Sequence, residues 1–362
     1  MGVFKVNGKD ITTIAEVIST SDKRKSSTAF SSGKLKVTGL SDSGKTLANA
    51  PSGSYEDWGF HNIVGNKLKV NGTADSVSKK GCRPNFASFS DYLYSKEGSA
   101  TVTITYDSSK GTIKAGDTTI NASVLIFQLV GAGGGGGAGG YSFWGSANGG
   151  GGGGGGGSIF GLLDFNNMPG GKATVVVGAQ GSSGSGEGSG GAGGASYIND
   201  GNGTRICTCN GGGAGTGDTR DHVGGKGGSG GTVSCIADCS YFRCFGKQTG
   251  GNGGNCGSAG GSCSSMKIST PDGVDLKTVA TSGGAAGSSG NTSRRGGGGG
   301  ASGSLISPSS WSGGSGGADD SNSGIYWGLL GGGGGGGGAD AYSSNGGYYG
   351  GNGYFQLFYD SN

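Results

Sequence analysis

The sequence has few of the residues from which enzyme active sites and nucleic-acid interfaces are built. Its 362 residues include 2 histidines, 5 prolines and a small, nearly balanced set of charges, 26 basic against 23 acidic. The formal net charge of +3 leaves no concentrated basic face of the kind that binds nucleic acid. There is no apolar stretch of the roughly 18 residues that a membrane span needs. We therefore expect no nucleic-acid partner and no membrane span.

The two histidines stand in no catalytic pattern. His222 belongs to a polar stretch between glycine runs, and His61 lies in the other half of the chain. A Ser-His-Asp or Cys-His arrangement needs a base that the fold positions, so we expect a solvated loop residue and a packed or surface residue instead. Asp319 and Asp320 are adjacent carboxylates, for which a solvated turn is expected rather than calcium binding or glycoside hydrolysis. The sequence thus predicts no catalytic residue, no metal site, no cofactor and no enzyme activity.

Seven of the eight cysteines fall between Cys207 and Cys263. Their spacing contains no pair of C-x-x-C knuckles, so a zinc site is poorly specified. Disulfides need an oxidising compartment, and the first residues contain no apolar segment of signal-peptide length. We expect small, partly buried thiols in loops, with bridged and metal-bound states as alternatives.

Residues 1–120 have the pattern of a β-rich domain. Phe4–Val6, Lys34–Val37 and Lys67–Val70 alternate lysine with apolar residues and end close to a glycine, which is typical of half-buried strands. Ala100–Tyr106 is a further strand, which a turn and a returning segment extend into a hairpin. A short helix near Thr12–Ile18 is the one helical candidate, so the fold is expected to be mainly β with little α-helix.

Three apolar segments are expected to form a small sheet in the second half, residues 121–362. Val124–Val130 runs straight into Gly131, and Tyr354–Tyr359 closes the glycine-rich region. Ala173–Val177 stands between two glycine runs. We predict that these segments pair and pin both ends of the region together.

Glycine is the abundant residue, with 94 copies, and long runs of it lie between residues 131 and 353. The usual share of glycine is about 7%. Ordering a glycine is costly in backbone entropy, so a disordered linker is one reading. Similar run lengths, aromatic loops between the runs and a closing apolar strand favour an ordered array instead.

A physical solution for an ordered array is the polyglycine II helix. This extended helix has about 3 residues per turn and no internal hydrogen bonds. Each N–H and C=O therefore points outward, and without a Cβ neighbouring helices approach until their backbones bond to one another. A bundle of such helices satisfies the backbone without a side-chain core.

The order of these segments resembles the glycine-rich domain of bacteriophage tail-fibre, adhesin and other virion surface proteins. The resemblance covers about residues 120–360. It rests on the apolar strand that enters Val130–Gly134, on Ala173–Ala179, and on the glycine-rich Gly346–Gly353 before the last strand. It implies a non-enzymatic tail-fibre or head-fibre component on the virion surface, made in the host cytoplasm and released by lysis.

The resemblance also implies partners. Residues 1–120 would attach to other virion proteins, and the glycine-rich domain would present loops to a bacterial surface glycan or outer-surface protein. Phage fibres are usually symmetric, so a homo-oligomer such as a trimer is expected. Aromatic residues dominate binding hot spots and stack on sugars, which makes the loop aromatics the receptor-binding candidates. These are Tyr141, Phe143, Trp144, Trp311, Tyr326, Trp327, Tyr348 and Tyr349.

Two other classes of function remain open at this stage. A capsid decoration or extracellular lattice subunit would need the same scaffold without a receptor. An ice-binding protein would use a flat face of glycine helices, although irregular loops disfavour it.

Overall fold

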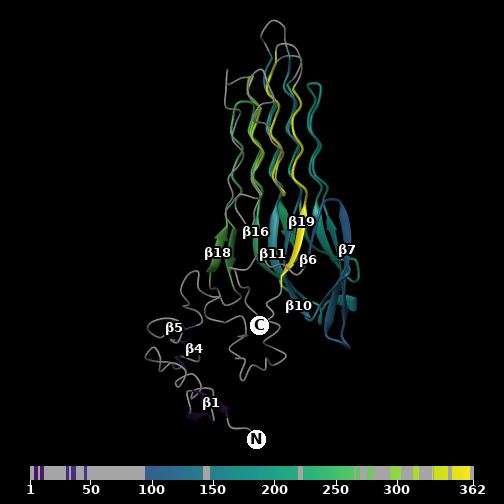
Figure 1. Cartoon of the computed structure of the whole chain (residues 1–362), viewed down its shortest axis with the longest axis vertical. Coiled ribbons are helices and arrows are strands. Elements are labelled where there is room, and N and C mark those ends of the chain that lie inside the picture. The colour runs from purple at the N-terminus through teal and green to yellow at the C-terminus, as the bar shows by residue number, and fades with distance from the viewer. Residues whose placement is uncertain are drawn as a thin grey trace. The chain divides into compact units, whose positions relative to one another are not determined.

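A computed structural model gives the fold, and Figure 1 shows it. The chain divides into two compact units, residues 1–91 with 268–277 and 359–362, and residues 92–267 with 278–358. The residues that the structure describes are 4–6, 9–11, 30–31, 34–37, 45–46, 94–141, 147–218, 223–264, 266–269, 275–279, 294–302, 313–317, 328, 330–340 and 345–358.

Short antiparallel strands make up the described part of the first 91 residues. β1 (Phe4–Val6) pairs with β2 (Lys9–Ile11), and β3 (Phe30–Ser31), β4 (Lys34–Val37) and β5 (Lys45–Thr46) form a three-stranded sheet. The strands predicted at Phe4–Val6 and Lys34–Val37 are therefore confirmed. The predicted strand at Lys67–Val70 and helix near Thr12–Ile18 lie outside the described residues.

A five-stranded sheet holds the two ends of the glycine-rich region together. Its strand order is β16 (Phe242–Gln248), β11 (Ser158–Asp164), β10 (Val124–Val130), β19 (Tyr354–Phe358) and β6 (Tyr94–Glu97). β10 and β19 are antiparallel, with Gln128 opposite Gln356. The predicted pairing of the opening and closing strands is thus confirmed. Every residue of β10 is buried, including the polar Gln128, as its near-continuous apolar run predicts.

A seven-stranded antiparallel sheet supplies the second layer. Its order is β15 (Val233–Cys235), β14 (Arg205–Cys209), β13 (Ser196–Asp200), β12 (Lys172–Val177), β7 (Ala100–Asp107), β8 (Thr112–Ala115) and β9 (Thr118–Ile120). β7 and β8 form the predicted hairpin, with Gly111 at a φ of 64° in its turn. Contacts of β12 with β19, of β10 with β13 and of β15 with β16 bring the two sheets against each other.

The prediction that residues 173–177 join the same sheet as β10 and β19 is wrong. β12 lies instead between β13 and β7. Its burial alternates, with Ala173 and Val175 buried, and these residues pair with Ile104 and Val102 of β7, whose burial also alternates. Strands with one buried face pair so that their apolar sets share that face, whereas β10 is buried on both faces.

The division of the chain at residue 120 stays a prediction. β6 to β9 precede this boundary, yet β7 pairs with β12 and β6 pairs with β19, so these strands share the compact unit of the glycine segments. The remaining described elements are the 3-10 turn η6 (Pro169–Gly171) and a two-stranded sheet of β17 (Met266–Ser269) and β18 (Asp275–Val279). No α-helix occurs in the described residues, so the prediction of a mainly β chain with little α-helix is confirmed.

Extended glycine segments continue from the strands and leave the two sheets in one direction (Figure 1). β10, β12, β14 and β16 lead into outgoing segments, and returning segments lead into β11, β13, β15 and β19. We call these segments together the glycine bundle. Its described members are residues 131–140, 148–157, 178–184, 188–195, 210–217, 224–231, 250–254, 258–263, 294–302, 313–317, 331–339 and 345–353.

Candidate functional site

Backbone hydrogen bonds within the glycine bundle repeat every three residues. In the segment 148–157, the N–H groups of Gly150, Gly153 and Gly156 donate to the segment 331–339. The N–H groups of the residues that follow these three donate to the segment 210–217. Those of Gly152 and Gly155 donate to the segment 250–254. These N–O distances are 2.7–3.0 Å. The donors of one segment therefore point in three directions, each toward a different neighbour.

The carbonyl groups of the same segment point toward three further neighbours. Carbonyls of 148–157 accept hydrogen bonds from N–H groups of 131–140, 224–231 and 294–302. The segment 148–157 is thus surrounded by six others. The segment 131–140 likewise bonds to six segments, which are 148–157, 178–184, 188–195, 210–217, 331–339 and 345–353. Most polar backbone groups of both central segments are thus bonded to backbone of neighbouring segments, as buried backbone requires.

Close approach, rather than unusual backbone angles, is what requires glycine in these segments. A Cβ on Gly153 would lie 2.0 Å from the carbonyl oxygen of Gly134, and a Cβ on Gly154 would lie 1.9 Å from that of Ser229. Among the described glycines of the bundle, Gly331 alone has a positive φ, of 74°. A side chain at most central positions would therefore collide with backbone.

We use the term distal end for the end of the bundle that lies away from both sheets (Figure 1). Here outgoing segments end at residues 140, 184, 217, 254 and 339, and the next segments of the bundle begin at residues 148, 188, 224, 258 and 345. Tyr141 forms an isolated parallel bridge with Asp340, and its N–H donates to the Glu187 carboxylate at 3.5 Å. Reversals that are distant in sequence are thereby joined at one surface.

A buried carboxylate anchors this end. Asp218 is 2% exposed, and its Oδ2 accepts a hydrogen bond from the N–H of Asn148 at 2.9 Å, at the start of a central segment. Burial first, and then the Asp218 charge, raise the pKa of the neighbouring Cys256 thiol. The role of Asp218 is structural, since it completes the backbone bonding of the segment that begins at Asn148.

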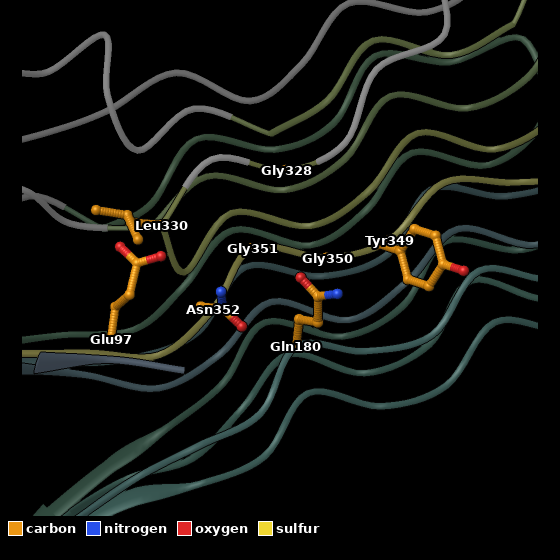
Figure 2. Close-up of a pocket in the computed structure, with 8 residues that line it drawn as sticks. All are labelled: Glu97, Gln180, Gly328, Leu330, Tyr349, Gly350, Gly351 and Asn352. Atoms are coloured by element: carbon orange, nitrogen blue, oxygen red, sulfur yellow. The ribbon is translucent and has the colours of Figure 1, made fainter. Parts of the chain in front are cut away.

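A second candidate surface is a pocket of about 380 Å³ on the flank of the bundle, shown in Figure 2. We call it the side pocket. The Tyr349 ring stands at one end, Glu97 and Leu330 stand at the other, and the amides of Gln180 and Asn352 lie between them (Figure 2). The wall is completed by backbone. The lining residues are Glu97, Gln180, Gly328, Leu330, Tyr349, Gly350, Gly351 and Asn352.

The structure places three of the predicted receptor-binding residues. Tyr141 is 53% exposed at the distal end, and Tyr349 is 48% exposed in the side pocket. Tyr348, which precedes Tyr349 in the sequence, is half-buried. Tyr141 and Tyr349 thus belong to two surfaces rather than one. The other candidates lie outside the described residues: Phe143, Trp144, Trp311, Tyr326 and Trp327. His61, His222, Asp319 and Asp320 also lie outside them.

Several residues of these surfaces were not singled out from the sequence. They are Val223, which is 60% exposed near the distal end, and the side-pocket residues Glu97, Gln180, Leu330 and Asn352. The available signal was the spacing of Tyr349 and Asn352. They stand three residues apart in a glycine run. Because the backbone hydrogen bonds also repeat every three residues, this spacing places both side chains on one side of the segment.

The expectation that the cysteines lie in loops is wrong for four of them. Cys207 and Cys209 belong to β14, Cys235 to β15 and Cys244 to β16, because small alternating residues suit these strands. Burial raises the pKa of the Cys207 and Cys209 thiols, and burial together with the Cys235 thiol raises that of Cys244 to about 12. At neutral pH these thiols are therefore protonated and weakly nucleophilic.

Within the part of the chain that the structure describes, no cluster of three or more histidine, cysteine, aspartate or glutamate residues is placed to hold a metal ion. In the same part, no helix is long and apolar enough to cross a membrane. No family model and no curated protein matches the sequence. The features of the described residues that bear on function are therefore the distal end, the side pocket and the glycine bundle that carries both.

Proposed function

We propose that the glycine segments are polyglycine II helices packed in a hexagonal bundle. Three observations support this assignment: the three-residue repeat of the hydrogen bonds, the six neighbours of each central segment, and the lack of positive φ at the described bundle glycines other than Gly331. A polyglycine II helix has about 3 residues per turn and directs all its polar groups outward. The repeat and the six neighbours are what that geometry requires.

On this basis we propose a non-enzymatic protein of a bacteriophage virion surface, a tail-fibre or head-fibre component that binds a host surface. The observation that carries the proposal is the separation of scaffold from exposed side chains. Central positions such as Gly153 admit no side chain, whereas the exposed Tyr141 and Val223 lie where segments reverse at the distal end. Binding specificity then depends on exposed side chains, and the central glycine segments stay constant.

The rest of the chain follows the same proposal. The first 120 residues attach the protein to other virion proteins, and a homo-oligomer, such as a trimer, forms the fibre. The binding partner is a bacterial surface glycan or outer-surface protein. Aromatic side chains offer large contact areas at low entropic cost, which suits Tyr141 to such a role.

Cell binding tests this proposal. Fluorescently labelled full-length protein should bind intact cells of one bacterial strain and not mutants that lack its receptor. The double variant Tyr141→Ala/Val223→Asp should bind at least about tenfold more weakly, since hot-spot truncations cost about 2 kcal/mol or more.

A matched control is Lys114→Ala, an exposed substitution on β8 in the seven-stranded sheet, which should leave cell binding unchanged. Absence of binding to every bacterial strain tested, together with stoichiometric presence over the capsid, would overturn adhesion and favour a decoration protein.

A further inference from the structure

The side pocket exists because of the three-residue repeat. In the segment 345–353, the N–H of Gly350 donates to Gly181, and the N–H of Gly351 donates to Gly332. A Cβ on Gly350 would lie 2.0 Å from the carbonyl oxygen of Gly133, so that position is closed. At positions 349 and 352 the carbonyls accept hydrogen bonds from Gly328 and Gly331, whereas among the described residues no neighbouring segment accepts a hydrogen bond from their N–H groups. These positions carry the only two side chains of residues 349–353.

Neighbouring elements fix the other walls. Gly98 has a φ of 73°, and its N–H donates to the carbonyl of Gly353. A Cβ on Gly98 would lie 3.7 Å from the Asn352 amide. This turn after β6 sets Glu97 beside Asn352. On the facing side, the N–H of Gly328 donates to the carbonyl of Tyr349, and Leu330 packs against Val130 and Tyr354. Backbone hydrogen bonds and the packing of Leu330 thus hold the lining side chains in place.

We propose that the side pocket binds a neutral sugar unit of a glycan. The half-exposed Tyr349 ring offers an apolar face for the C–H face of a sugar ring. The Gln180 and Asn352 amides both donate and accept hydrogen bonds, and the Glu97 carboxylate accepts them from hydroxyl groups. The volume of about 380 Å³ falls within the range of small-ligand sites.

The charge of the side pocket restricts the class of sugar that can bind there. Glu97 is exposed and is the only ionisable carboxylate among the lining residues, so an acidic sugar meets a like charge there. Glycoside hydrolysis generally uses two carboxylates that flank the bond to be cleaved. A single carboxylate beside an aromatic ring therefore fits recognition of a sugar without cleavage. This inference rests on the proposed host-surface function and names the chemical class of one binding partner.

The test is a binding titration by ligand-observed NMR with the full-length protein. The probes are the methyl glycosides of glucose, galactose, mannose and N-acetylglucosamine, with glucuronic acid as the acidic comparator. We expect at least one neutral glycoside to bind. Tyr349→Ala should weaken that binding by about tenfold or more, while Tyr349→Phe keeps most of it because the ring remains. Glu97→Gln should allow glucuronic acid to bind.

Lys114→Ala is the matched control, since it removes an exposed side chain of β8 in the seven-stranded sheet and should leave glycoside affinity unchanged. Equal loss in Lys114→Ala and Tyr349→Ala, or no binding of any neutral glycoside to the unmodified protein, would overturn the pocket assignment. Cell binding measured in parallel separates the two proposals. Adhesion without glycoside binding contradicts the side pocket alone, and glycoside binding without adhesion contradicts the proposed host-surface function alone.

Discussion

Replacing Gly153 with alanine is expected to destabilise the protein by about 3 kcal/mol or more, because overpacking commonly costs 1–3 kcal/mol even where neighbours can shift. The added carbon would lie 2.0 Å from the carbonyl oxygen of Gly134. That oxygen also accepts a hydrogen bond from Gly334 at 2.9 Å, so moving it breaks a second contact. Urea unfolding, followed by circular dichroism, measures the free energy of unfolding.

The matched control is Gly346→Ala, another glycine of the bundle. The nearest atom to a Cβ there is the carbonyl oxygen of Gly184 at 3.3 Å, and its φ is not positive. Its stability should change by less than about 1 kcal/mol, since the smaller entropy of the unfolded chain offsets minor crowding. Equal stability of the two variants would contradict the packing described for residues 148–157.

Replacing Phe127 with alanine is expected to cost about 3–5 kcal/mol, the usual range for a fully buried phenylalanine. Phe127 is 0% exposed in the middle of β10, where it pairs with Gly161 of β11 and Leu357 of β19. Its ring centre lies 6.3 Å from that of Phe242. A Cβ on Gly161 would lie 2.5 Å from the carbonyl oxygen of Arg243 and 3.0 Å from the Phe127 ring, which together explain a glycine inside β11.

Because β10 opens the glycine-rich region and pairs with the closing strand β19, this variant should also lower the cooperativity of unfolding of the bundle. The denaturant dependence of unfolding reports it, since the slope follows the surface exposed. Tyr141→Ala serves as the control, because it truncates an exposed aromatic side chain and should alter stability little. A loss below about 1 kcal/mol in Phe127→Ala would be incompatible with a core centred on β10.

Local patterns in the sequence were sufficient to predict several strands. The near-continuous apolar run at Val124–Val130 indicated a strand, which the structure buries on both faces. The segment Ala100–Tyr106 indicated a strand with a hairpin partner, and its burial alternates in the structure. The similar closing segment at residues 354–359 indicated a partner for β10. In each case the burial is encoded in the spacing of apolar residues.

The partner of β12 and the side pocket were beyond sequence reasoning. Which sheet accepts Lys172–Val177 depends on β7 and β13, whose alternating faces match it, and strand pairing over such distances leaves no local signal. The side of a glycine segment that faces outward depends on which neighbours surround it. Tyr349 could be noticed as an aromatic residue, but Glu97 and Gln180 become its neighbours only through the fold.

Amide hydrogen exchange tests the central claim most directly, which is that the glycine segments form an ordered, backbone-bonded array. NMR on protein labelled with ¹⁵N-glycine would follow Gly150–Gly157, whose N–H groups all donate to backbone carbonyls of neighbouring segments. We predict that these amides exchange as slowly as those of β10, through global unfolding. Rapid exchange across Gly150–Gly157 in the folded protein would contradict the bundle and the function proposed from it.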